Sequence, residues 1–114
     1  MEPFLQRGIA LFNQGEYFQC HEVLEERWAP ERGPRRLFLQ SLIHVAVGFH
    51  HGQRGNPAGA VRQLRKGLRK LGAYLPFWES VDTARLDREV RLVLEQIEAG
   101  ETVSTYPQIQ VLVD

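Results

Sequence analysis

The chain has 114 residues, of which 43% are hydrophobic and 25% are charged, and these values are typical of one globular domain. They exclude intrinsic disorder, and no apolar run is long enough to span a membrane. The N-terminus lacks the basic-then-apolar layout of a signal peptide, so we expect a cytoplasmic protein with no membrane partner. The single cysteine, Cys20, cannot form an internal disulfide and is expected to be a small reduced hydrophobe.

The formal net charge is zero, but the charges are not evenly distributed. Residues 1–31 contain six acids and two bases, residues 32–78 contain nine bases and no acid, and residues 79–114 contain eight acids and three bases. Acidic outer helices could lie beside basic inner ones, or the basic segment could form a surface for an anionic partner. The charge pattern leaves both interpretations open, and it also allows a homo-oligomer.

Hydrophobic spacing and turn residues predict five helices. In chain order they occupy residues 3–14, 16–29, 35–53, 57–73 and 83–99. The third is the most apolar and has almost no polar face, so it should be central. We therefore predict an all-α fold, a compact bundle of about five helices in a single domain spanning residues 1–114. Its core should comprise about residues 3–100, and the tail, residues 101–114, should be extended or loosely docked.

Two predicted helices turn polar side chains toward the core. Each residue of a helix advances about 100°, which places His21 and Glu25 in the middle of the apolar face of the second helix, beside Phe18 and Trp28. On the third helix the same arithmetic gives a narrow polar stripe of Gln40, His44 and His51. Because a buried carboxylate without a partner loses several kcal/mol of hydration, we expect the two polar stripes to meet.

Three interpretations of this His/Glu cluster remain open. It could be a structural polar network that fixes the register of the helices. It could hold one divalent metal ion, since imidazoles with a carboxylate are the usual zinc ligands, and the candidate ligands are then His21, Glu25 and His51. It could instead catalyse acid/base chemistry through His21 and Glu25, with a small ligand contacting Trp28, Gln40, His44 and His51. The sequence does not decide whether the protein is an enzyme.

The predicted fourth helix offers a second candidate site. Its basic residues are Arg62, Arg65, Lys66, Arg69 and Lys70. They could be an ordinary solvated face, or they could bind phosphate or nucleic acid. The first aromatic residue after them is Tyr74, so a protein that stacks single-stranded bases is disfavoured.

The chain also resembles a known family. The resemblance is carried by the string Gly15-x-Tyr17-Phe18-x-x-His21-Glu22-x-Leu24-Glu25-x-x-Trp28, together with residues 42–46 and 51–60. These stretches are similar to the small prokaryotic family known as domain of unknown function 309, and the likeness covers residues 8–72. It implies an all-helical bundle but no activity or cofactor. The residues that match the family pattern are His21, Glu22, Glu25, Trp28 and His51. His44 stands where such sequences often have glutamine, which argues against it as an obligatory ligand.

Overall fold

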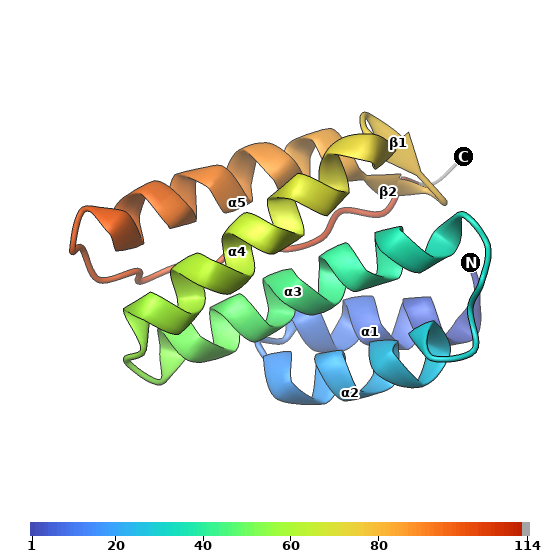
Figure 1. The fold of residues 1–114 in the computed structure, drawn as a ribbon, viewed down its shortest axis with the longest axis horizontal. Helices are drawn as coiled ribbons and strands as arrows, with labels where there is room; N and C mark the ends of the chain where they lie inside the picture. The colour runs from blue at the N-terminus through green and yellow to red at the C-terminus, as the bar shows by residue number, and fades with distance from the viewer. Residues whose placement is uncertain (113–114) are drawn as a thin grey trace.

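The computed structural model describes residues 1–112 and consists mainly of helices (Figure 1). The five α-helices are α1 (Pro3–Asn13), α2 (Tyr17–Trp28), α3 (Arg35–Gln53), α4 (Pro57–Leu71) and α5 (Thr83–Glu98). A short 3₁₀ helix, η1 (Gly72–Tyr74), extends α4, and an antiparallel hairpin of β1 (Phe77–Trp78) and β2 (Val81–Asp82) precedes α5. The predicted all-α bundle of five helices is therefore confirmed. The small hairpin was not predicted.

Helix α3 lies at the centre of the bundle. It packs against α2 on one side and against α4 on the other, and α4 packs in turn against α5 (Figure 1). Nine of its 19 residues are buried, more than in any other helix of the described chain. The prediction that this segment is the central helix is confirmed.

Two glycines allow α3 and α4 to approach each other closely. A Cβ atom on Gly67 would lie 2.9 Å from Val45 Cγ2 and 3.1 Å from the Ser41 carbonyl oxygen. A Cβ atom on Gly48 would lie 2.7 Å from Leu64 Cδ2. Larger side chains at either glycine would force the two helices apart. The close contact therefore fixes the position of α4 relative to α3, and with it the position of the outer face of α4.

Local signals set the ends of α4. The Asn56 side chain accepts a hydrogen bond of 3.0 Å from the Gly59 N–H, and Pro57 occupies the first turn, where its missing N–H is not needed. The helix ends at Leu71, two residues earlier than predicted, because the next residues tighten into η1.

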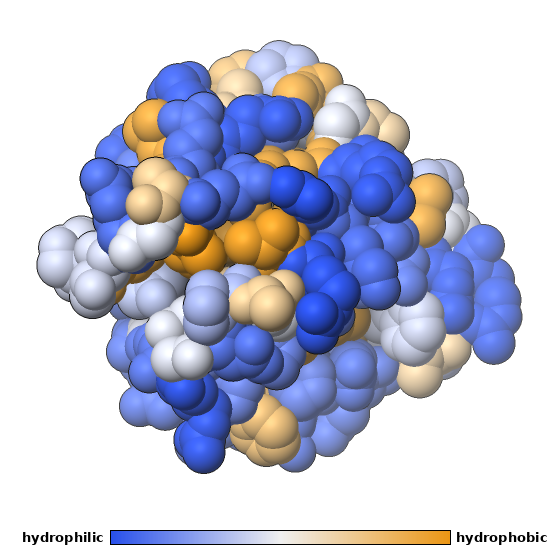
Figure 2. All heavy atoms as spheres, turned by 60° about the vertical axis from the view of Figure 1, so that its left-hand side comes forward, coloured by the Kyte–Doolittle hydropathy of each residue, from blue (hydrophilic) through white to orange (hydrophobic). Residues whose placement is uncertain are grey.

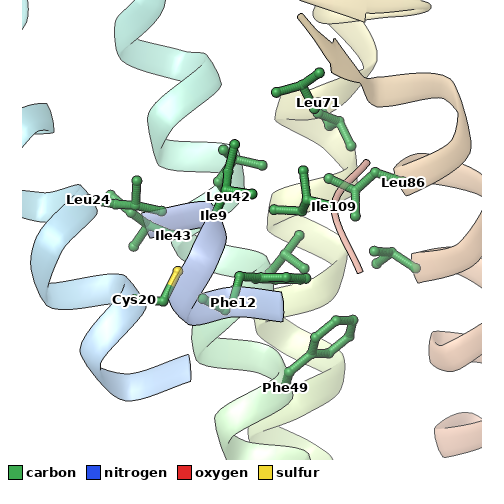
Figure 3. Packing of buried hydrophobic residues seen from close by; sticks show 14 of the residues in the cluster. Ile9, Phe12, Cys20, Leu24, Leu42, Ile43, Phe49, Leu71, Leu86 and Ile109 are labelled. Carbon is green, nitrogen blue, oxygen red and sulfur yellow. The ribbon is translucent and has the colours of Figure 1, made fainter. Parts of the chain in front are cut away.

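The segment after α5 is extended and returns along α5 toward β2 (Figure 1). Ile109 is only 2% exposed, and Figure 3 shows it between Leu42 and Leu86. Asn13 holds its backbone from α1, accepting from the Ile109 N–H at 2.7 Å and donating to its carbonyl at 3.0 Å. Val111 pairs with Val81 of β2. Residues 101–112 thus contribute to the core, and the last two residues of the expected tail lie outside the described part.

Two further expectations can be compared with the fold. Cys20 is buried as a free thiol, and burial raises its pKa to about 12, so it is packed as a small hydrophobe and is not a reactive thiolate. Within residues 1–112, no helix combines the length and the apolar character that crossing a membrane requires.

Candidate functional site

The α2 residues of the predicted cluster lie at the edge of the helix interface. The buried face of α2 consists of Tyr17, Cys20, Val23 and Leu24. The centre of that face lies about 90° from His21 around the helix. The His21 side chain is accordingly 19% exposed and that of Glu25 is 51% exposed. The prediction that both point into the core was wrong, because Cys20 and Val23 shift the buried face away from them.

His21 is nevertheless held in a defined orientation. Its Nδ1 lies 2.7 Å from the Phe18 carbonyl oxygen, which can only accept, so Nδ1 carries the proton of the neutral ring. Its Nε2 is then unprotonated and has a lone pair available, and it lies 3.7 Å from Glu25 Oε2. The pair therefore offers one imidazole nitrogen and one carboxylate to solvent.

A second histidine, His50, lies beside this pair and was not selected from the sequence. Its ring is 5.5 Å from the ring of Phe18, which is itself 5.0 Å from the ring of His21. Phe18 is 52% exposed. Burial lowers the pKa of His50, and the charges of Arg54, His51 and His21 lower it further. The short loop between α2 and α3 could have indicated this neighbour from the sequence. A short loop makes the two helices antiparallel, which places the start of α2 beside the end of α3.

His51 faces α4 rather than α2. The side-chain amide of Asn56 donates to His51 Nδ1 at 3.3 Å, and Asn56 is also the residue that caps α4. A Cβ atom on Gly59 would lie 3.0 Å from the His51 ring. His51 therefore supports the start of α4.

His44 also contacts α4. Its Nδ1 lies 2.8 Å from Gln63 Oε1, and Lys70 Nζ donates to its Nε2 at 3.3 Å. The pKa of His44 is lowered mainly by burial and also by the charges of Lys70 and Lys66, while the hydrogen bond to Gln63 acts in the opposite direction. The expected meeting of the two polar stripes thus does not occur at His44 or His51, because both are satisfied by α4. Gln40 is half-buried one turn before His44.

Trp28 and Glu25 border a surface groove. The groove has a volume of about 470 Å³ and is lined by Glu22, Glu25, Glu26, Trp28 and Ala29. The Arg36 guanidinium lies 4.0 Å from the centre of the Trp28 ring, a favourable cation–π arrangement. The Trp28 Nε1–H is buried and has no acceptor within residues 1–112. The groove therefore touches two of the candidate residues, Glu25 and Trp28, but not His21 or His51.

Two other grooves lie away from the predicted site residues. One, of about 820 Å³, separates the outer face of α5 from the tail. The other, of about 290 Å³, lies between the α3–α4 turn and the end of α5, and it is lined in part by Ile97, Val103 and Tyr106. Figure 2, turned toward this end, shows hydrophobic atoms in a hollow with a hydrophilic rim. The predicted catalytic, metal and basic residues line neither groove.

The three predicted metal ligands do not come together. Among residues 1–112 there is no group of three or more His, Cys, Asp or Glu side chains that could hold a metal ion. His21 and Glu25 face each other, but His51 belongs to the α4 side. The described residues thus provide a two-ligand pair.

The basic face of α4 is exposed and largely without ion pairs. Arg62, Lys66 and Arg69 are exposed, and within the described chain none of them forms an ion pair with an acid. Arg65 pairs with Glu98 of α5. We call Arg62, Lys66 and Arg69 the α4 stripe.

Comparison with known proteins places the chain in a family. Residues 5–63 match the family described as domain of unknown function 309. The chain belongs to the DUF309 family. It is 38% identical over 97 residues to the uncharacterized protein YpuF of Bacillus subtilis, and 21% identical over 107 residues to an uncharacterized protein of Aquifex aeolicus. The alignments cover 82% and 93% of this chain but only 54% and 31% of those relatives.

The DUF309 match covers some of the candidate residues but not others. It includes all four histidines, Glu25 and Gln63. It ends before the lysines that flank His44, so Lys66 and Lys70 lie in the segment that follows. The chain is thus a small helical DUF309 protein with histidines in its hydrogen-bond network.

Proposed function

We propose that this protein binds the phosphate backbone of nucleic acid through the outer face of α4. The observation that carries the proposal is the α4 stripe, three exposed cations that no acid neutralises within residues 1–112. Residues 32–78 contain no acid at all, so neither α3 nor α4 itself offers a carboxylate that would offset the positive charge of the stripe.

The spacing of the α4 stripe suits a regular polyanion. Arg62, Lys66 and Arg69 are separated by four and three residues, so they lie on one side of the helix over about 10 Å of its axis. Duplex DNA carries one negative charge per roughly 1.7 Å of its axis, so several phosphates fall within that length. The stripe can therefore contact more than one phosphate at once.

The same face favours backbone contacts over base stacking. Tyr74, the aromatic residue nearest to the stripe in sequence, is buried and donates its hydroxyl to the Pro34 carbonyl oxygen at 2.7 Å. A protein that binds single strands by stacking needs exposed aromatic rings among its cations. We therefore expect binding to double-stranded nucleic acid with little sequence preference.

A charge-neutralising variant tests the proposal. Binding to a labelled duplex of about twenty base pairs is measured by fluorescence anisotropy at low salt, for RNA and for DNA. Replacing the α4 stripe by glutamine, in R62Q/K66Q/R69Q, should weaken binding at least tenfold, because each cation removed loses one phosphate contact.

The matched control removes the same charge from α5. Arg85, Arg88 and Arg91 lie on α5, where Glu89 and Asp87 already pair with the first and the last of them. R85Q/R88Q/R91Q should bind nearly as well as the unmodified protein. Equal losses in the two triple variants, or no binding by the unmodified protein, would contradict the proposal.

A second candidate function is weak binding of a divalent metal by His21 and Glu25. It is favoured by the free Nε2 of His21, which faces the Glu25 carboxylate. Water would have to complete the coordination, because zinc prefers four ligands. Saturating Zn²⁺ should then raise the melting temperature of the unmodified protein and of H44Q, but not that of H21Q. No shift with any divalent ion would remove this candidate.

A further inference from the structure

A polar contact of unusual composition lies beside the α4 stripe. Lys70 Nζ donates to His44 Nε2 at 3.3 Å, and His44 Nδ1 is 2.8 Å from Gln63 Oε1. Lysine ammonium groups usually pair with carboxylates, but this one faces an imidazole. Within residues 1–112 the Lys70 ammonium forms no ion pair with an acid, and residues 32–78 contain no acidic residue.

The packing of α3 on α4 creates this contact. Gly67 lies between Lys66 and Lys70 on α4, and a Cβ atom there would be 3.3 Å from His44 Cβ and 3.1 Å from the Ser41 carbonyl oxygen. The close approach brings the His44 ring within hydrogen-bond distance of the Lys70 ammonium and close enough to Lys66 for its charge to act on the ring. Because Lys66 and Lys70 are four residues apart, their ammonium groups can converge on the same space above the ring.

The hydrogen bonds assign the proton of His44. Gln63 Oε1 can only accept, so Nδ1 carries the proton of the neutral ring. Nε2 is then the acceptor for Lys70. If His44 becomes charged, Nε2 carries a proton too, and two donors face each other with no acceptor between them. An anion placed there would accept from both.

We propose that His44, Lys66 and Lys70 form a phosphate site in which His44 takes up a proton from solvent as the anion binds. This inference rests on the proposed function and deepens it, because the site would hold one phosphate of the nucleic acid that lies along the α4 stripe. A free inorganic oxyanion has the same chemistry, so both kinds of ligand belong in the test.

The charges around His44 give the sign of the pH dependence. Lys66 and Lys70 of α4 are the charged groups that act on it, while His21 and Glu25 of α2 face each other. Burial and the two lysines keep the pKa of His44 below its usual value in the free protein. A bound phosphate offsets the lysine charges and raises it. The complex therefore holds more protons than the free protein, and binding should tighten as the pH falls, by up to tenfold per pH unit for one proton.

The test measures binding of the full chain between about pH 6 and pH 8, the range in which histidine titrates. The probes are a duplex, whose phosphodiesters do not titrate there, and inorganic sulfate, whose charge is also constant. H44Q is the central variant, because a glutamine can still accept from Lys70 but cannot take up a proton. H50Q is the matched control, a histidine whose neighbours are Phe18 and His51.

We expect binding to the unmodified protein and to H50Q to be severalfold tighter at the lower pH. H44Q should bind as the unmodified protein does at the higher pH and should lose the tightening. K70Q should bind both probes more weakly at either pH. NMR titration of the histidine rings provides an independent measurement, in which sulfate should raise the pKa of His44 and leave that of His50 nearly unchanged.

The outcomes separate this inference from the proposed function. Duplex binding whose pH dependence is the same in H44Q overturns the inference and leaves the proposed function standing. Sulfate binding that tightens through His44, without duplex binding, supports the phosphate site and overturns the proposed function. Absence of binding to either probe at both pH values overturns both.

Discussion

Helix α4 carries a row of arginines and lysines and helix α5 a row of arginines, but acids pair with a larger share of the basic residues on α5. On α5, Arg85 is 2.9 Å from Glu89 and Arg91 is 2.9 Å from Asp87, each one helical turn away. On α4, only Arg65 has an acidic partner within the described chain. The number of basic residues therefore says less about a binding surface than whether acids already neutralise them.

The largest effect is expected from disturbing the contact that positions α4. In G67A the new methyl group would lie 2.9 Å from Val45 Cγ2 and 3.1 Å from the Ser41 carbonyl oxygen, and that backbone oxygen cannot move easily. We expect a loss of about 1–3 kcal/mol in the free energy of unfolding, measured by urea denaturation.

The control for this variant is the same substitution where there is space. Gly72 follows α4 with φ of −54°, and a methyl group added there would meet no atom within 4 Å. G72A should be neutral or stabilising by about 0.4–1 kcal/mol, because it restricts the unfolded chain. Equal destabilisation in G67A and G72A would show that the close helix approach is not what matters.

A smaller effect should distinguish two arginines on the same helix. R69Q removes a cation without an acidic partner and should weaken duplex binding severalfold, whereas R65Q removes one that Glu98 already neutralises and should change it less. Fluorescence anisotropy at low salt measures both. An R65Q defect as large as that of R69Q would mean that ion pairing does not decide which cations bind.

The reverse change offers a gain. E98Q removes the partner of Arg65 and adds a free cation to the outer face of α4. Duplex binding should tighten severalfold, and its dependence on salt should steepen by about one released ion. Weaker or unchanged binding in this variant would contradict the comparison of paired with unpaired charges.

The smallest effect is expected on α5. Arg91 is exposed, and its pair with Asp87 spans one turn, where such pairs contribute about 0.3–0.5 kcal/mol. D87N should therefore lower the free energy of unfolding by at most that amount. A loss above about 1 kcal/mol would show that the Asp87 side chain, which is only 14% exposed, stabilises the fold beyond its pair with Arg91.

The fold was largely predictable because it depends on local signals. The helix starts follow caps and prolines, such as Asn56 and Pro57, and the central position of α3 follows from its nearly continuous apolar sequence. The hairpin before α5 has strands of two residues each, too short for an alternating pattern. The docking of the tail depends on Asn13, which lies 96 residues from Ile109 in sequence.

The candidate site was predicted less well because it depends on the rotation of each helix. Placing His21 at the centre of the buried face of α2 ignored Cys20 and Val23, and an error of about 90° moves a side chain from the core to the edge. His44 was expected to face the polar residues of α2, but its two polar partners both come from α4. The surface position of the basic residues of α4 could be predicted from the amphipathic spacing of the helix alone. All five lie at exposed or half-buried positions.

The dependence of duplex binding on salt tests the central claim most directly. If Arg62, Lys66, Arg69 and Lys70 each displace a counterion from a phosphate, the logarithm of the association constant should fall with the logarithm of the salt concentration with a slope of about −3 to −4. Between about 50 mM and 200 mM salt, affinity should therefore drop roughly 60- to 250-fold. Binding that does not change with salt, or a slope that R62Q/K66Q/R69Q leaves unchanged, would contradict the assignment of α4 as the nucleic-acid surface.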